Sequence, residues 1–135
     1  MDRYDPETAP APEDWLALDE GERIHLVEAY HRDARIDLPR KARTLHASIH
    51  VVVENQLALN DEPVVRALAR LLKEELSRHD AVHAIGSVVA EQIYDLLKLN
   101  DTSETTRPRY YAAIERLTAA SWRAINDDQD TGRSN

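Results

Sequence analysis

Residues 46–83 read H-A-S-I-H-V-V-V-E-N-Q-L-A-L-N-D-E-P-V-V-R-A-L-A-R-L-L-K-E-E-L-S-R-H-D-A-V-H, and the rest of the chain is organised around them. The stretch begins and ends with a His-x-x-x-His pair, His46 with His50 and His79 with His83. Residues four apart lie on one face of a helix, about one turn from each other. Each pair can therefore present two imidazoles in one direction, and two neighbouring helices would bring four imidazoles to one point.

The spacing of apolar residues predicts three helices in and around this stretch. They run from about Arg40 to Leu59, from Pro63 to Leu76 and from Arg78 to Lys98. A short acidic turn separates the first two, so we expect them to be antiparallel neighbours. The S-x-x-D pattern that begins at Ser77 is a start signal for the third.

The flanking segments predict more helices and no strand. Pro12–Leu18 reads as a short helix, and Asp19 as the cap of another helix that ends near Arg35. Pro108 opens a last helix that ends near Ile125. The sequence therefore predicts an all-α bundle of five to six helices with antiparallel neighbours joined by short loops. Residues 1–11 are expected to be an extended N-terminal arm, 12–125 a single helical-bundle domain and 126–135 a disordered tail.

Periodicity also predicts which side chains are buried. On the helix over residues 40–59 the expected buried face consists of Leu45, Ile49, Val52, Val53, Gln56 and Leu57. Gly86 costs a helix about 1 kcal/mol relative to Ala, so we expect another helix to approach closely there. His25 and His31 are six residues apart and do not share a face, and we expect them at the surface or at the edge of the core.

Composition excludes several classes of function. The chain has 17 Lys and Arg against 25 Asp and Glu, a formal net charge of −8, which argues against nucleic acid and against an anionic membrane surface as partners. It has no cysteine, so a metal site must use His, Asp or Glu, and a reducing cytoplasm is the expected location. No apolar run is long enough to span a membrane, and the first residues lack the pattern of a secretory signal.

The main hypothesis is one divalent metal ion bound by four histidines. Neutral imidazole suits zinc first, and then nickel or iron. The predicted ligands are His46, His50, His79 and His83. Three carboxylates are candidates for alternative ligands or for partners that orient an imidazole, namely Glu54, Asp80 and Glu75.

Two other interpretations stay open. The histidines could be hydrogen-bonded core residues, or an unrelated exposed set, in a metal-free interaction module. Alternatively, H-D-A-V-H resembles the zinc-protease pattern H-E-x-x-H, which would make the protein a metal-dependent hydrolase with Asp80 as the base. In that pattern Val89 replaces the third histidine, and the shorter Asp80 replaces a glutamate.

The run H-A-S-I-H-V-V-V-E-N-Q-L-A-L-N-D-E-P-V-V-R, followed by R-H-D-A-V-H-A-I and a Tyr-bearing helix, resembles a known family. It is the family of small bacterial proteins catalogued as domain of unknown function eighteen-forty-one, or a sister of it. The resemblance covers about residues 44–117 and implies a bacterial, cytosolic, helical protein with no established activity. A non-catalytic metal-binding or interaction protein is the expected function. Leftover apolar stripes are compatible with a homodimer or an unidentified protein partner.

Overall fold

The structure, a computed structural model, describes residues 1–36, 39–98 and 103–125. Within these ranges it is all-α, without strands, as the sequence predicts. The predicted tail over residues 126–135 lies outside the described part. The helices are α1 (Pro12–Ala17), α2 (Glu20–Asp33), α3 (Arg40–Ala58), α4 (Glu62–Lys73), α5 (Arg78–Lys98) and α6 (Ser103–Arg116), with a further short helix over residues 119–125.

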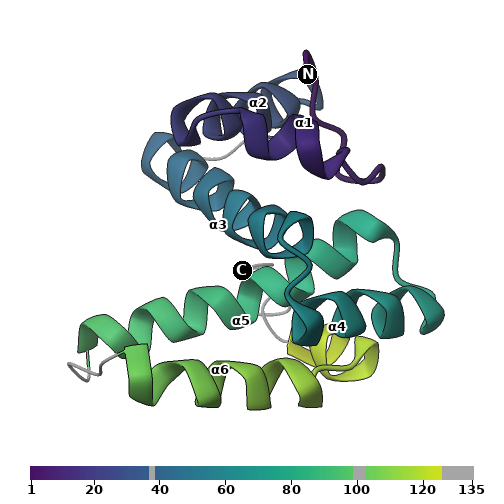
Figure 1. The fold of residues 1–135 in the computed structure, drawn as a ribbon, viewed down its shortest axis with the longest axis vertical. Helices are drawn as coiled ribbons and strands as arrows, with labels where there is room; N and C mark the ends of the chain where they lie inside the picture. Colours follow the sequence, from purple (N-terminus) through teal and green to yellow (C-terminus); the bar gives the residue numbers. More distant parts are fainter. Residues whose placement is uncertain (37–38, 99–102, 126–135) are drawn as a thin grey trace, which may run out of the picture.

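Helix α3 is the centre of the fold. Figure 1 shows α1 and α2 on one side of it and α4, α5 and α6 on the other. Two apolar clusters follow this division. The first includes Trp15, Val27 and Val51, and the second includes Val53 and Ile85. Because both sides of α3 are covered, the helix contributes buried side chains to both clusters, Ala47 and Val51 to the first and Val53 to the second.

This central position corrects the prediction of a single buried face on α3. Leu45, expected in the core, is 58% exposed. Ala47 and Val51, outside the predicted stripe, are fully buried against the α1–α2 side. A 3.6-residue pattern detects one apolar stripe, and it fails for a helix that packs on two sides.

The N-terminal helices are fixed to α3 by polar contacts as well as apolar ones. Asp19 caps α2, since its Oδ1 accepts the backbone N–H of Glu22 at 2.8 Å. The indole N–H of buried Trp15 donates to Oδ1 of Asn55 at 2.8 Å, and Arg23 donates to the same oxygen at 3.0 Å. Asn55 on α3 therefore anchors both α1 and α2.

The N-terminal segment that precedes α1 is non-helical and packs against the bundle. Tyr4 is only 4% exposed, and its ring lies against the rings of Trp15, Tyr30 and His50. Pro6 is also buried. This segment consequently contributes to the interior rather than only preceding it.

The predicted close approach at Gly86 is present. A methyl group placed on Gly86 of α5 would lie 2.8 Å from Cγ2 of Ile49 on α3. That methyl of Ile49 is attached at Cβ, so it moves only if the stiff χ1 angle of a β-branched residue changes. The glycine thus sets the distance between α3 and α5.

The prediction of one last helix from Pro108 to about Ile125 is wrong, because the helix starts earlier and the segment is broken into two helices. Helix α6 begins at Ser103, Pro108 lies inside it, and it ends at Arg116 before a separate helix over residues 119–125. Proline in a helix interior costs about 3 kcal/mol. The packing of α6 on α5 outweighs this local preference, as the burial of Thr106, two residues before Pro108, illustrates.

Two side chains at the C-terminal end of α4, Arg70 within the helix and Glu74 directly after it, explain the break after α6. The Arg70 guanidinium donates to the carbonyls of Ile114 and Leu117, which lie at the C-terminal end of α6. Glu74, the residue directly after α4, accepts the N–H of Ala119 at 2.9 Å. A cation at a helix C-terminus and an anion at a helix N-terminus are both favourable. Arg70 therefore stabilises the end of α6, and Glu74 stabilises the start of the helix over residues 119–125.

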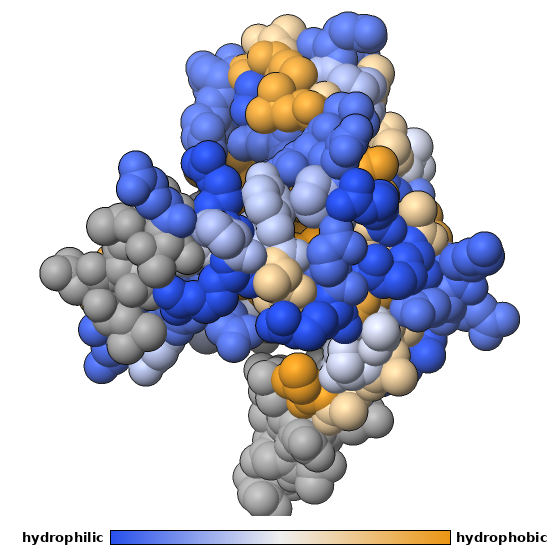
Figure 2. All heavy atoms as spheres, turned by 60° about the horizontal axis from the view of Figure 1, so that its bottom comes forward, coloured by the Kyte–Doolittle hydropathy of each residue, from blue (hydrophilic) through white to orange (hydrophobic). Residues whose placement is uncertain are grey.

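Figure 2 shows a face dominated by hydrophilic side chains, with small and separate apolar patches. In the described part of the chain, no helix is long and apolar enough to cross a membrane. Several large apolar side chains are nevertheless exposed, among them Leu59, Tyr94 and Leu97. The predicted homodimer or protein partner stays a prediction.

The close contact at Gly86 can be tested with a pair of glycine substitutions. Gly86→Ala gains helix propensity but forces a methyl into Ile49, and overpacking costs about 1–3 kcal/mol. Gly21→Ala on the exposed start of α2 meets only Oδ1 of Asp19 at 3.4 Å and serves as the control. Urea denaturation should show Gly86→Ala to be the less stable variant. Equal stability of the two would show that α3 and α5 do not approach as described.

Candidate metal centre

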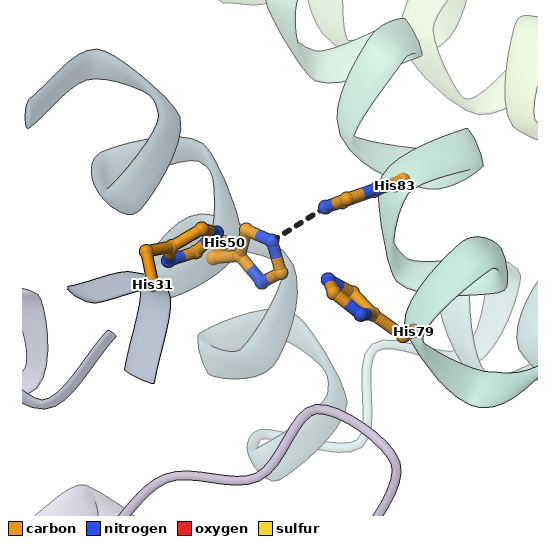
Figure 3. Close-up of side chains that lie close together, drawn as sticks. All are labelled: His31, His50, His79 and His83. Carbon is orange, nitrogen blue, oxygen red and sulfur yellow. Dashed lines mark hydrogen bonds between the residues drawn. The ribbon is translucent and has the colours of Figure 1, made fainter. Parts of the chain in front are cut away.

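Four imidazoles from three helices converge between the two apolar clusters. His31 comes from α2, His50 from α3, and His79 and His83 from α5 (Figure 3). One ring nitrogen from each lies within 4.8 Å of the corresponding nitrogen of every other. His31 and His50 are 3% and 1% exposed, while His79 and His83 are partly exposed. The site is therefore buried on the α2–α3 side and more open on the α5 side.

The outer nitrogen of His31 is held by its own helix. Its Nδ1 lies 2.7 Å from the carbonyl oxygen of Val27, one turn earlier on α2. A carbonyl only accepts, so Nδ1 must carry the proton and donate it. The lone pair of this imidazole then resides on Nε2, which faces the cluster. Ligating histidines in metal sites are commonly held in this way.

His50 is oriented by a chain of hydrogen bonds that ends at a buried carboxylate. The hydroxyl of Tyr4 donates to Oε2 of Glu54 at 2.5 Å and lies 3.2 Å from Nδ1 of His50. Because the single hydroxyl proton goes to the carboxylate, the Tyr4 oxygen accepts from Nδ1–H of His50. His50 thus has the same tautomer as His31, with the Nε2 lone pair directed at the other imidazoles.

The charge of Glu54 is neutralised by Arg78, the first residue of α5. The guanidinium makes two hydrogen bonds, Nη1 to Oε2 at 2.9 Å and Nη2 to Oε1 at 2.8 Å. The carboxylate is almost fully buried, and the Arg78 side chain is 10% exposed. Breaking such a buried pair typically costs about 3–5 kcal/mol. This ion pair therefore fixes the N-terminal end of α5, and with it His79 and His83, against α3.

The N-terminal segment closes over the same end of α5. The carbonyl of Pro6 accepts a hydrogen bond from Arg78 at 2.9 Å, and Oε1 of Glu7 accepts the backbone N–H of His79 at 2.7 Å. An acidic group at the first turn of a helix satisfies a free N–H and interacts favourably with the helix dipole. Residues 4–7 consequently hold both His50 and His79 in place.

Two of the four inner nitrogens lack the partners that normally accompany burial. Nε2 of His31 and Nε2 of His79 are buried and make no hydrogen bond to the described residues. In the other pair, Nε2–H of His83 donates to the lone pair on Nε2 of His50 at 2.9 Å. Leaving a buried polar group unsatisfied costs about 1–3 kcal/mol. A cation placed among the four nitrogens would satisfy them all.

A fifth imidazole, that of His46, lies beside this set. Its ring centroid is 4.6 Å from that of His31 and 4.9 Å from those of His50 and His83. The side chain is partly exposed. The group of four mutually close nitrogens contains His31 and does not contain His46.

Burial and mutual repulsion lower the pKa values of His46, His50, His79 and His83. Burial, together with His31 and His79, lowers the pKa of His46 to about 4. Burial, with the neighbouring histidines, lowers the pKa of His83 to about 3 and depresses that of His50 further. The pKa of His79 is also lowered, chiefly by burial. The ring nitrogens are thus in the form that binds metals near neutral pH.

The spacing of the four nitrogens fits a metal site after small movements. With zinc–nitrogen bonds of about 2.0–2.1 Å, a tetrahedral site separates its nitrogens by about 3.3–3.4 Å. The pair of His50 and His83, at 2.9 Å, must widen slightly. The longest separation, up to 4.8 Å, must contract, which is a shift of about 0.7 Å for each ring. Rotation about the side-chain torsions can supply such shifts.

The predicted carboxylates occupy other roles. Both oxygens of Glu54 are used by Arg78 and Tyr4, so Glu54 acts on His50 through Tyr4 rather than as a ligand. Asp80 donates its backbone N–H to Ser77 Oγ at 3.1 Å, which supports the start signal read from the sequence. Glu75 is exposed in the turn before α5, where its φ is 74°. Neither Asp80 nor Glu75 contributes an oxygen to the group of mutually close ligand atoms.

Sequence reasoning located His50, His79 and His83 but missed His31. The expectation that His31 lies at the surface or core edge is wrong, whereas His25 is exposed. A signal was present, since Ile24, Val27 and His31 fall at positions i, i+3 and i+7 of α2 and so share its buried stripe. Tyr4 and Arg78 carried no comparable signal, because their partners are 50 and 24 residues away.

No family model, curated protein or solved structure matches the chain. The resemblance to the bacterial family described above therefore stays a prediction from the sequence. The candidate site rests on the geometry of its own residues.

The depressed histidine pKa values make a prediction for the metal-free protein. As pH falls below about 6.5, the unfolded chain binds protons on its imidazoles, while folded His46 and His83 resist them until about 4 and 3. Stability should therefore fall between about pH 6.5 and 5, above the range in which most carboxylates titrate. Melting temperatures of chelator-treated protein measure this.

Two variants provide the comparison for this pH dependence. His83→Gln removes one buried imidazole and should flatten the decrease in melting temperature, whereas His25→Gln at an exposed position should not. A melting temperature that stays constant across this pH range in the original chain would contradict the account of a buried neutral cluster.

Proposed function

We propose that this protein binds one divalent metal ion through His31, His50, His79 and His83, and that the site is not catalytic. The observation that carries the proposal is the state of the inner nitrogens. Nε2 of His31 and Nε2 of His79 are buried without a hydrogen bond, and Nε2 of His50 and Nε2 of His83 bond only to each other, at 2.9 Å. In hydrogen-bonded core histidines both ring nitrogens would have partners. In an unrelated exposed set, the outer nitrogens would not be held by buried partners as those of His31 and His50 are.

The donor set favours a transition metal over magnesium or calcium. All four ligands are neutral imidazoles, and hard cations require oxygen ligands. Four nitrogens around one point suit tetrahedral zinc, so zinc is the first candidate, followed by nickel or iron. The bound ion would keep its full charge in the site, because the nearby Glu54 is already neutralised by Arg78.

Several features weigh against the alternative of a metal-dependent hydrolase. Such an enzyme needs an open coordination position and a base beside it. Here four protein nitrogens would fill all four positions of a tetrahedral ion, and no oxygen of Asp80 belongs to the set of mutually close ligand atoms. We therefore propose a binding role, in which the ion links α2, α3 and α5. A bacterial, cytoplasmic setting belongs to the same proposal.

The direct test is metal content and thermal stabilisation of the full chain purified without a histidine tag. We expect about one zinc per chain and a higher melting temperature with zinc than after chelation. His83→Gln should lose the metal and the stabilisation, while His25→Gln, which changes an exposed histidine outside the cluster, should retain both. A metal content near zero, with no shift on adding zinc, nickel or iron, would contradict the proposal.

The hydrogen bonds behind His50 should tune the affinity. Tyr4→Phe removes the oxygen that accepts from Nδ1 of His50, and the loss of such an orienting partner typically weakens metal binding about 10–100-fold. Tyr30→Phe is the matched control, because the Tyr30 ring packs against His31 and His79 and its hydroxyl makes no hydrogen bond to the described residues. Chelator-competition titrations compare the two variants. Equal affinities would show that the contact between Tyr4 and His50 does not orient a ligand.

A further inference from the structure

Resting on the proposed function, we propose that His46 is an exchange ligand, which replaces His79 on the bound metal while the ion enters or leaves the site. The protein would then hold its metal as exchangeable cargo rather than as a permanent structural ion. This role gives a function to His46, the imidazole that lies beside the four proposed ligands but is not one of them.

The position of His46 supports this role. Four of the six ring pairs in the four-histidine set have centroids 4.3–5.5 Å apart, the shortest between His79 and His83 and the longest between His50 and His79. The His46 ring lies 4.6–4.9 Å from His31, His50 and His83, which falls inside that range. His46 is thus already a neighbour of three ligands. Rotation about its side-chain torsions is the movement needed to direct a nitrogen at the ion.

The ligands also differ in how firmly they are held. His31 and His50 each have an outer nitrogen engaged, with Val27 and with Tyr4. No such outer bond restrains His79 or His46 within the described part of the chain. The metal therefore has two fixed imidazoles on the buried side and less restrained imidazoles on the more open side, where an exchange of ligands requires no rearrangement of the core.

The exchange balances without any other reactant. A bond from the metal to His46 forms as the bond to His79 breaks, and both imidazoles are neutral before and after. The oxidation state of the metal, the number of protons and the net charge do not change. An incoming chelator or acceptor can then bond to the ion on the side that His79 has left, and a bond from the ion to another imidazole breaks as that bond forms, so transfer does not wait for a bare ion to dissociate.

The test measures zinc transfer from the loaded full chain to an excess of a coloured small-molecule chelator. The variants are His46→Gln and His46→Asn, with His25→Gln as the control. We expect both His46 variants to retain about one zinc and its thermal stabilisation but to transfer zinc about tenfold more slowly than the original chain. His25→Gln should transfer at the original rate.

Each other outcome has a defined meaning. A transfer rate unchanged in the His46 variants would overturn the exchange role while leaving the metal site intact. Loss of zinc from both variants would make His46 a permanent ligand, and failure of both to fold would make it a structural residue. Either result would also overturn this proposal. If the original chain itself binds no zinc, nickel or iron, the proposed function fails and the exchange role fails with it.

Discussion

His50 and Glu54 lie one turn apart on α3, and both are almost completely buried at the centre of the fold. Burial of an imidazole and a carboxylate requires partners, because the interior offers no water to replace their hydrogen bonds. Arg78 at the start of α5 and Tyr4 in the N-terminal segment provide them. The need to satisfy these two side chains therefore positions segments that are far apart in the sequence. It explains why the N-terminal residues pack into the bundle instead of extending from it.

The same arrangement leaves two buried imidazole nitrogens, Nε2 of His31 and Nε2 of His79, without a hydrogen-bond partner among the described residues. The outer nitrogens of His31 and His50 have partners, but the inner nitrogens meet only other imidazoles. Burying Nε2 of His31 and Nε2 of His79 without a partner is unfavourable unless a proton or a cation lies beside them. The depressed pKa values of His46 and His83 argue against protons near neutral pH, because burial disfavours the charged imidazole. A divalent metal ion, as we propose, would supply the missing positive charge, and the four imidazoles are the ligand type that zinc, nickel and iron accept.

Much of this organisation could be predicted from local patterns, and the remainder depends on long-range packing. The start of α5 after Ser77, the cap at Asp19 and the close approach at Gly86 follow from residue chemistry that acts within a turn or two. The pairing of His50 with His79 and His83 required only that α3 and α5 be neighbours. The burial of His31 follows from its spacing to Val27 on the buried stripe of α2, whereas its spacing to the exposed His25 carries no such signal. The course of α6 through Pro108 depends on packing against α5, which no local signal encodes.

The central claim is that one metal ion is held by four imidazoles, and X-ray absorption spectroscopy of the metal-loaded chain tests it most directly. The account predicts a first shell of four nitrogens at about 2.0–2.1 Å for zinc, with the outer-shell scattering that imidazole rings produce. Replacing His31 should reduce that shell by one imidazole, because His31 is the ligand that the structure adds to the sequence-based set. A shell made mainly of oxygen, or one unchanged by the loss of His31, would contradict the account.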